Sequence, residues 1–223
     1  MRLTVVQIAG PISVQAAPRT GRMHEGVPPG GAVLPSRLHA ANRAAGNRDD
    51  APAIELLGRL VVRDDAGRET TYESPVWTYA AAPGGQDVPG LVTTWLRKGD
   101  VLRGPLVLAP PVPAADARVR VLPGPDLDAF APGALEALCG GSYDVVTPER
   151  TGARLRGPAL ARSSTRDVTR PMVRGAIEVA RDGLPIVLGP DHPTTGGYPI
   201  IGVIAEAEVE RVFAATRVRF YVA

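Results

Sequence analysis

The sequence predicts a mainly β protein, organised as a sandwich or barrel with a few short helices. Glycine (25) and proline (23) recur along the 223 residues and separate short runs rich in Val, Ile and Leu. Such turn-bounded runs of β-branched residues are typical of antiparallel β folds. The predicted strands are Met1–Ile8, Ala53–Arg63, Thr70–Tyr79, Val101–Ala109, Arg118–Leu122, Tyr143–Thr147, Ala176–Ala180, Pro185–Leu188, Ile200–Ile204 and Arg217–Val222.

Three stretches carry apolar residues at the 3.6-residue spacing of amphipathic helices. They are Ser36–Ala45, Asp128–Cys139 and Glu206–Ala214. The second stretch ends at Gly140-Gly141, and glycine is a common residue just after a helix. We therefore expect helices to be few and short.

A proline-rich stretch divides the chain into two halves of about a hundred residues each. It reads Pro110-Pro111-Val112-Pro113-Ala114-Ala115-Asp116. Segments of this composition commonly join domains. We expect an N-terminal domain over residues 1–113 and a C-terminal domain over residues 117–223.

The composition excludes several classes of protein. Hydrophobic residues make up 44% and charged residues 22%, which is ordinary for a globular protein. No apolar run approaches the roughly 20 residues that span a bilayer, and the N-terminus alternates like a strand rather than a signal peptide. The single cysteine, Cys139, excludes an internal disulfide and a cysteine-based zinc site. These features favour a cytoplasmic protein without a membrane partner.

Charge patterning argues against nucleic acid and against a phosphate-binding P-loop. The net charge is +2, basic and acidic residues are mixed, and aromatic residues are 4% of the chain, so there is no basic patch interleaved with aromatics. Lys98 is the only lysine, and Gly99-Asp100 follows it where a P-loop needs Ser or Thr. We expect a small-molecule substrate instead.

The densest polar, glycine-rich stretch is Asp191-His192-Pro193-Thr194-Thr195-Gly196-Gly197-Tyr198-Pro199. Two hydroxyls followed by two glycines allow side-chain oxygens and backbone amides to converge on an anion or a carbonyl. A tight turn between two strands explains the same composition. Both interpretations stay open on the sequence alone.

Two further features are candidates for ligand binding. Arg150 and Arg154 flank Gly152 and would share one face of a strand, where they could grip a carboxylate, unless they are simply surface arginines. The loop Gly26–Ala32 precedes the helix that carries Asn42; it could bind a phosphate, but turn chemistry explains it as well.

No metal and no cofactor are expected. His24, His39 and His192 are the only histidines, and no two of them have the spacing of metal ligands on one helix. Cys139 ends an apolar helical face and is interpreted as a small core residue rather than a nucleophile.

Taken together, these stretches resemble the allophanate hydrolase subunit two family, also known as the 5-oxoprolinase C-subunit family or the antagonist of the Kip inhibitor. One match runs from Val14 to Glu55, and a second from Val121 to Phe220. The first match includes Gln15, Arg19, Gly21, Gly26-Val27-Pro28, Gly31-Ala32, Ala41-Asn42, Gly46-Asn47 and Glu55; the second includes Val121–Pro125, Arg150, Gly152, Arg154-Leu155, Gly175–Ile177, Pro185–Leu188, Asp191 and Thr194–Pro199.

The resemblance implies two cyclophilin-like β-barrel domains in tandem. It also implies a role beside a subunit-B partner and a larger third subunit, which together open 5-oxoproline to glutamate at the expense of ATP. Related domains form the carboxyltransferase half of urea carboxylase.

The sequence departs from the family at positions that carry charge. Ala16 and Leu34 stand where the family has Asp, and Ile200 stands where a Lys follows Gly-Gly-Tyr-Pro. The middle is also shortened, since Gly84–Pro89 passes almost directly to Leu96–Asp100. Loss of several acid–base and anion-binding groups argues against the ancestral chemistry, while the retained glycines and prolines favour a persistent scaffold.

Three functions therefore compete. The favoured one is a repurposed, cofactor-free enzyme with a largely apolar barrel pocket, such as a cyclase of specialised metabolism acting by holding its substrate in a reactive conformation. The alternatives are the C-type subunit of an ATP-dependent 5-oxoprolinase or allophanate-hydrolase complex, and a non-catalytic regulatory subunit. We expect a monomer or a homodimer in the first case, and a heteromer with a subunit-B-like protein in the second.

The residues predicted to form the site come from the motifs above. The predicted catalytic residues are Arg150, Arg154, Thr195 and Tyr198. The predicted substrate-binding residues are Arg19, His24, Asn42, Asp191, His192, Thr194, Gly196 and Gly197.

Overall fold

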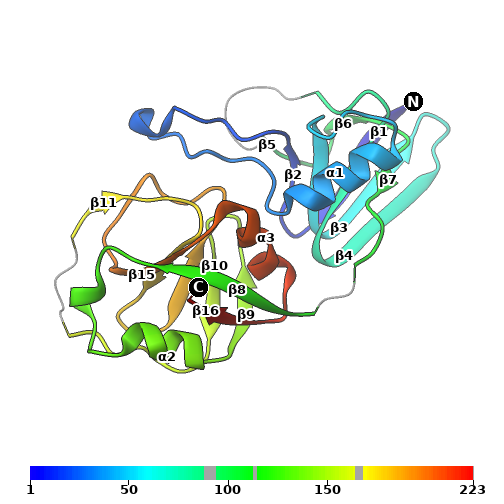
Figure 1. Ribbon diagram of the computed structural model, residues 1–223. Helices are drawn as coiled ribbons and strands as arrows, with labels where there is room; N and C mark the ends of the chain where they lie inside the picture. Colours follow the sequence, from blue (N-terminus) through cyan, green and yellow to red (C-terminus); the bar gives the residue numbers. More distant parts are fainter. Residues whose placement is uncertain (88–93, 113–114, 164–167, 223) are drawn as a thin grey trace. The chain divides into compact units, whose positions relative to one another are not determined.

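The chain folds into two units, each built around its own β-sheet (Figure 1). The computed structural model describes residues 1–87, 94–112, 115–163 and 168–222. Unit 1 comprises Met1–Arg19 and Gly30–Val112, and unit 2 comprises Thr20–Pro29 and Pro113–Ala223. Residues 20–29 thus group with unit 2, although the predicted N-terminal domain included them. Pro113 and Ala114 of the predicted joint lie outside the described residues.

Unit 1 is an antiparallel sheet with a long central strand. Its strands are β1 (Arg2–Ala9), β2 (Ile12–Gln15), β3 (Ala53–Asp64), β4 (Glu69–Ala81), β5 (Thr94–Trp95), β6 (Val101–Arg103) and β7 (Val107–Leu108). β3 pairs with β2 along its first half, with β1 along its second half, and with β4 on its other side. β5, β6 and β7 extend the sheet at β2, β1 and β4.

A close backbone approach explains two glycines in this sheet. Gly10 and Gly58 both have positive φ angles, 103° and 115°. A Cβ at Gly10 would lie 2.3 Å from the Leu57 carbonyl oxygen, and one at Gly58 would lie 2.1 Å from the Ala9 carbonyl oxygen. Only glycine fits this contact, which lies where β3 passes from β2 to β1.

Helix α1 (Pro35–Ala44) packs against β3 and β4 through its buried residues Leu38, Ala41 and Asn42. It begins one residue before the predicted helix, because proline suits the first turn, where no backbone N–H is needed. The short helix η1 (Met23–Glu25) lies in the segment that groups with unit 2.

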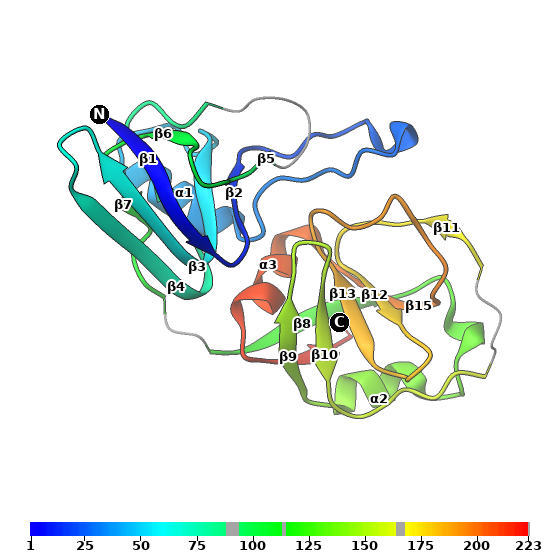
Figure 2. The ribbon, with the colours of Figure 1, turned by 180° about the vertical axis from the view of Figure 1, so that it is seen from behind.

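Unit 2 closes into a barrel of seven strands (Figure 2). These are β8 (Asp116–Pro123), β9 (Tyr143–Pro148), β10 (Gly152–Arg156), β12 (Ala176–Val179), β13 (Pro185–Leu188), β15 (Ile200–Ile204) and β16 (Arg217–Tyr221). Their order is β10-β13-β12-β15-β8-β16-β9, and β9 pairs with β10 to close the ring. The neighbours are antiparallel except β8 and β16, which run parallel.

The helices of unit 2 cover the barrel. α2 (Ala134–Gly140) contacts β16, and α3 (Glu206–Ala214) packs on β8 through Val209, Val212 and Phe213. The predicted helix Asp128–Cys139 is in fact two pieces, since a 3-10 turn η2 (Leu127–Ala129) is separated from α2 by Pro132-Gly133. Gly133 has a φ of 81°, which is incompatible with a continuous helix.

The barrel interior is apolar and tightly closed. Val119, Val121, Leu155, Ile177 and Ile201 are completely buried. Tyr143 packs against Phe220 with ring centroids 6.0 Å apart, and burial raises the pKa of its hydroxyl to about 12. Because strand residues alternate in direction, the neighbours of these core residues lie on the outer face of the barrel.

The predicted mainly β fold is confirmed, with most predicted strands found within a residue or two. The predicted strand Val101–Ala109 is interrupted at Gly104-Pro105 and forms β6 and β7 instead. β2, β5, β10 and two short strands described below were not predicted. A closed barrel was expected in each unit. Unit 2 has one, whereas the sheet of unit 1 is open among its described residues. Val88 and Pro89, at the end of the segment Gly84–Pro89 noted above, lie outside the described residues. No described helix is long and apolar enough to cross a membrane.

Candidate functional site

The glycine-rich stretch 191–199 lies against the outer face of the barrel in unit 2. Its centre forms β14 (Thr195–Gly196), which pairs with β11 (Arg170–Pro171) as a two-stranded ribbon. The ribbon is extended by a hydrogen bond from the Met172 N–H to the Thr194 carbonyl, 3.0 Å. Its far end is joined to β12 by a hydrogen bond from the Val179 N–H to the Pro199 carbonyl, 3.0 Å.

Arg150 and Asp191 form a buried bidentate ion pair that holds this stretch in place. The Arg150 side chain is 3% exposed, and its Nε and Nη2 donate to the two Asp191 oxygens at 2.7 and 2.9 Å. The Asp191 N–H also donates to the Arg150 carbonyl at 3.0 Å. Such two-point pairing is among the strongest side-chain contacts. Both predicted site residues are thus brought together, and they fix the loop to the β9–β10 turn.

The expectation that Arg150 and Arg154 share one strand face is wrong. Arg150 lies in the turn before β10, because β9 ends at Pro148 and β10 begins at Gly152. Arg154 lies within β10 and points to the exposed face, where it pairs with Asp182 at 3.3 Å. Only Arg154 therefore reaches a surface that a ligand could occupy.

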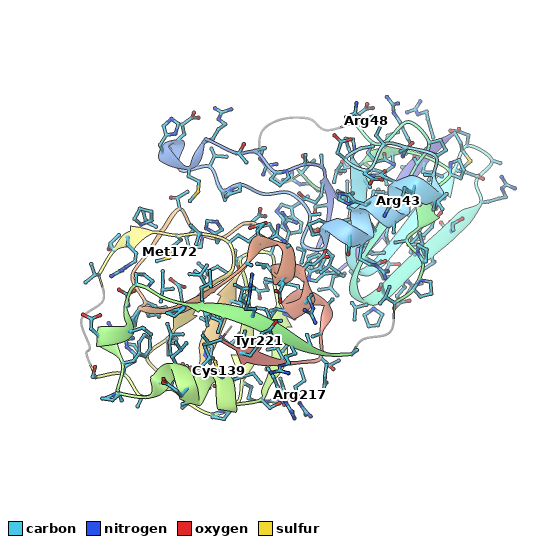
Figure 3. The ribbon with its side chains drawn as sticks, in the orientation of Figure 1. Arg43, Arg48, Cys139, Met172, Arg217 and Tyr221 are labelled. Atoms are coloured by element: carbon cyan, nitrogen blue, oxygen red, sulfur yellow. The ribbon has the colours of Figure 1, made fainter. Side chains whose placement is uncertain are left out.

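A buried carboxyl outside the predicted set of residues lies under the ribbon. Glu178, on β12, is 7% exposed and makes no hydrogen bond or ion pair with the residues that the structure describes. A Cβ at Gly196 would lie 2.7 Å from its Oε1 and 2.5 Å from the Met172 Cε, so the ribbon crosses directly over it. Met172 is labelled in Figure 3, just after β11. Burial raises the pKa of Glu178.

The surroundings of Glu178 explain why no cation neutralises it. On β15 its partner is Ile200, which stands where the family has a Lys, and on β13 its partner is Ile186. Ile200 is buried in an apolar cluster with Met172, Ala176 and Leu188. A register shift between Ile177 and Glu178 marks a β-bulge, a feature common beside active sites.

Arg154 lies in the same row as Glu178 across the outer face. Arg154 pairs with Ile186, and Ile186 pairs with Glu178, so all three side chains leave the sheet on one side. Two strand spacings separate Arg154 from Glu178, about 10 Å between their Cα atoms. A cavity of about 380 Å³ lies over this face, lined by Glu149, Thr151, Gly152, Arg154, Ile186, Leu188 and Pro193.

A second charged cavity adjoins the other end of the ribbon. It has a volume of about 190 Å³, and Gly197, Pro199, Asp126 and Arg170 contribute to its lining. Arg170 and Asp126 form an ion pair at 2.5 Å, and Asp126 also accepts a hydrogen bond from the Ile200 N–H at 2.8 Å. Asp126 is therefore a fully engaged carboxylate that orients Arg170 and anchors the start of β15.

A larger cavity, about 720 Å³, lies between the loops Ala159–Ser163 and Arg181–Gly183. None of the predicted site residues lines it. Its Asp182 is the partner of Arg154, which places it beside the row described above. The glycine-rich motif and the Glu178 carboxyl are not part of its lining, so the candidate site lies at the ribbon.

The remaining motif residues line or support the ribbon. His192 is 1% exposed, and its Nδ1 lies 2.8 Å from the Pro193 carbonyl oxygen. We therefore assign the ring proton to Nδ1, which donates to that carbonyl. The Nε2 atom is then a buried acceptor without a partner among the described residues. Tyr198 is half-buried with no hydrogen bond in the described part of the chain, whereas Thr194 is half-buried and Thr195 is exposed.

Asn42 has a structural role in unit 1. Its amide donates to the Asp49 carbonyl at 3.0 Å and the Ala51 carbonyl at 2.7 Å, and its oxygen accepts from Asn47. Both N–H groups are thus used to hold the loop after α1, which leaves none for a substrate. Its prediction as a ligand residue came from the motif, which cannot separate loop closure from binding.

The other predicted residues of the first match have different roles. The Arg19 guanidinium lies under Gly30, where a Cβ would come within 2.1 Å of its Nη2. His24 is 75% exposed beside Glu25 in η1. The end of the loop before α1 is held by Glu55, which accepts from the Val33 N–H at 2.8 Å, while the Leu34 N–H donates to Tyr79. These two amides are therefore not available to a phosphate.

The described acidic, histidine and cysteine side chains bear on two further kinds of chemistry, metal binding and a reactive thiol. Within the described ranges, no three His, Cys, Asp or Glu side chains group in a way that could hold a metal ion. Burial raises the pKa of Cys139, which disfavours the reactive thiolate. Cys139 lies on α2 (Figure 3), away from the ribbon elements.

The sequence carries one signal for Glu178, although the residue was not predicted as part of the site. The other residues of the strand Ala176–Val179 are apolar, which predicts a buried strand. A glutamate within it is therefore an ionisable residue at a buried position. Such residues are candidates for functional sites.

Comparison with known proteins identifies the fold and the relatives. Residues 97–220 match the family described as carboxyltransferase domain, subdomain A and B. The chain is 28% identical over 265 aligned positions to the C subunit of 5-oxoprolinase from Escherichia coli strain K12, covering 93% of this chain and 86% of that protein. The aligned length exceeds the 223 residues present, so the relative contains segments that this chain lacks.

Solved structures share the fold at lower identity. TTHA0988 superposes with a TM-score of 0.79 at 24% identity, covering 99% of this chain and 56% of that one. The urea amidolyase of Kluyveromyces lactis superposes with a TM-score of 0.78 at 22% identity, covering 98% of this chain and 18% of that one. This chain therefore spans little more than half of the first structure and a smaller part of the second.

Proposed function

The chain belongs to the carboxyltransferase domain family of subdomains A and B, and we propose that it is one subunit of an ATP-dependent, amide-opening complex of the 5-oxoprolinase type. The observation that carries the proposal is the alignment with the C subunit of 5-oxoprolinase, which extends over 93% of this chain. The Gly-Gly-Tyr-Pro ribbon and its Arg150–Asp191 anchor are intact in this chain, which supports the same assignment.

A heteromer is part of this proposal, because the chain lacks the usual means of binding ATP. Its single lysine is not part of a P-loop, and no other glycine-rich loop here has a nucleotide-binding spacing. We place ATP on another subunit, and the amide on the outer face of the unit 2 barrel. A subunit-B-like protein is the expected partner.

The charges at the site support this proposal over a cyclase. The cyclase hypothesis rested on a pocket stripped of acid–base groups. Glu178, Arg154, Asp126 and Arg170 instead place two carboxyls and two guanidinium groups around the ribbon. Cleavage of an amide needs proton transfer and carbonyl polarisation, which the Glu178 carboxyl and the Arg154 guanidinium can supply.

Purification of the tagged chain from its own host tests the proposal. Native mass spectrometry should find a complex with a subunit-B-like chain, and the complex should open 5-oxoproline to glutamate only when ATP is present. The chain alone should be inactive. A homodimer with no second chain, together with no ATP-dependent ring opening in the host extract fraction, would remove this function.

A further inference from the structure

Glu178 differs from the other buried acids of unit 2 in having no partner among the described residues. Asp191 is paired with Arg150, and Asp126 is paired with Arg170 and an N–H of the backbone. Burying a carboxyl without a cation or a donor disfavours its ionised form, and burial raises the pKa of Glu178. A neutral carboxyl is both a hydrogen-bond donor and an acid.

The carboxyl lies beside a cavity and keeps 7% exposure, and its oxygens are not among the fully enclosed side-chain atoms without a partner. The ribbon closes over it at Gly196, Met172 packs beside it, and Ile186 and Ile200 flank it on the neighbouring strands. Ile186 and Pro193 also line the 380 Å³ cavity that contains Arg154. A methyl group at Gly196 would press on the ends of the Met172 and Glu178 side chains, which would both have to shift.

The apolar floor between Arg154 and Glu178 matches the uncharged ring of a lactam. The two side chains leave the same face about two strand spacings apart, so a five- or six-membered ring lying over Ile186 lies within reach of both. Arg154 offers N–H donors to a carbonyl oxygen, and Glu178 offers a carboxyl to the amide nitrogen. Ile186 between them excludes water from the ring.

We propose that Glu178 is the proton donor to the leaving nitrogen of a lactam that binds across Ile186, with its carbonyl toward Arg154. This inference rests on the proposed function and adds to it a catalytic residue and the orientation of the ring on the binding surface. The N–H of the lactam must face Glu178, whatever other groups the ring carries.

The step balances as a hydrolysis. The oxygen of a water molecule bonds to the carbonyl carbon, and the ring C–N bond breaks with its electron pair moving to nitrogen. The Glu178 carboxyl gives its proton to that nitrogen and recovers one from the attacking water. The complex hydrolyses ATP with a second water molecule, and the glutamyl side chain returns to its starting state.

Activity of the whole complex tests the catalytic role. Glu178→Gln keeps the shape but removes the acid, so it should lower kcat for ATP-dependent opening of 5-oxoproline about 10²- to 10⁴-fold. Glu136→Gln on α2 is the matched control, since Glu136 is exposed, and its activity should stay within twofold of wild type. Native mass spectrometry and thermal unfolding check that both variants assemble and fold. Activity of Glu178→Gln within twofold of wild type overturns the proposal.

Binding to the isolated full-length chain tests the site independently of turnover. With glutamate labelled at the carboxyl carbon, the Glu178 resonance is identified as the one lost in Glu178→Gln. Added 2-pyrrolidinone or 5-oxoproline should shift that resonance, whereas N-methyl-2-pyrrolidinone, which has no N–H, should not. A resonance that neither lactam moves overturns the proposal, and so does one that the N-methyl compound moves equally. If the lactams shift the Glu178 resonance but the wild-type complex opens no 5-oxoproline, the proposed function is wrong while the lactam site at Glu178 is supported.

Discussion

Two buried glutamates, one in each unit, show opposite uses of the same side chain. Glu55 of unit 1 is completely buried on β3 and accepts hydrogen bonds from the Val33 N–H and the Tyr79 hydroxyl. Glu178 of unit 2 is 7% exposed on β12 and has neither a donor nor a cation among the described residues. Both lie within apolar strands, so burial alone does not separate them.

The difference lies in what the surrounding fold offers each carboxyl. Glu55 meets a loop whose backbone N–H needs an acceptor, and the pairing holds the entry to α1 in place. Glu178 meets Ile186, Ile200 and Gly196, which offer no side-chain donor. A satisfied buried acid stabilises a fold, whereas an unsatisfied one costs stability and is kept where a ligand supplies the missing partner.

The largest expected effect is the loss of the satisfied acid. Glu55→Ala leaves the Val33 N–H and the Tyr79 hydroxyl without their acceptor, so we expect the free energy of unfolding to fall by about 4 kcal/mol. Chemical denaturation followed by circular dichroism measures this. Glu73→Ala on the exposed side of β4 is the control and should change stability by less than about 0.5 kcal/mol. Equal losses in the two variants would show that Glu55 is not a structural anchor.

A somewhat smaller loss is expected for the pair that anchors the ribbon. Arg150→Ala leaves Asp191 largely buried without its cation, which should cost about 3 kcal/mol. Arg43→Ala breaks an exposed pair with Asp49 (Figure 3), where the side chains are 63% and 47% exposed, and should have almost no effect. Thermal unfolding of both variants separates buried from exposed pairing. A loss for Arg150→Ala no larger than for Arg43→Ala would contradict the anchoring role.

The smallest effect is a gain in stability at the unsatisfied acid, and it depends on pH. Burial raises the pKa of Glu178 in the folded state above its value in the unfolded chain, about 4.3. The folded state then holds a proton that unfolding releases, so its stabilising contribution is complete below that pH and is lost as the pH rises through the folded pKa. Glutamine has no proton to release.

Glu178→Gln should therefore match wild type near pH 4 and exceed its unfolding free energy by about 1 kcal/mol above neutrality. The groups that face residue 178 are the same in both proteins: β13 and β15 present Ile186 and Ile200, the ribbon presents Gly196, and the charged group in the same row is Arg154 of β10, paired with Asp182. Urea unfolding across this pH range measures the difference. A constant difference at every pH would mean that Glu178 does not hold its proton.

Much of the fold was predictable because its signals are local. Alternating or β-branched runs bounded by glycine and proline predicted β3, β4, β8, β12, β13, β15 and β16 close to their observed bounds, and α3 to the residue. β10 was missed because Gly152 and two arginines, Arg154 and Arg156, leave only two apolar residues in the strand. β11 and β14 have two residues each, so they exist only because their two loops meet.

The candidate site was predictable only in part. The motif pointed to residues 191–199 and to Arg150, and the structure does join Arg150 to Asp191. It could not separate structural from ligand roles, so Asn42 was assigned to a substrate although its amide closes a loop. The sequence shows isoleucine at position 200, where the family has a lysine. It does not show that Ile200 lies beside Glu178, because the pairing of strands β12 and β15 brings these two residues together.

The sequence by itself determined which segments become strands, where the turns fall and which family the motifs resemble, since these depend on residues close together in the chain. Only the tertiary structure decided which buried acids are satisfied. A carboxyl's partners come from other strands and loops, as Val33 and Tyr79 do for Glu55, and Gly196 and Ile200 for Glu178. A shift of one residue in the pairing of these strands would give each carboxyl different neighbours, and its hydrogen bonding and acidity would change accordingly.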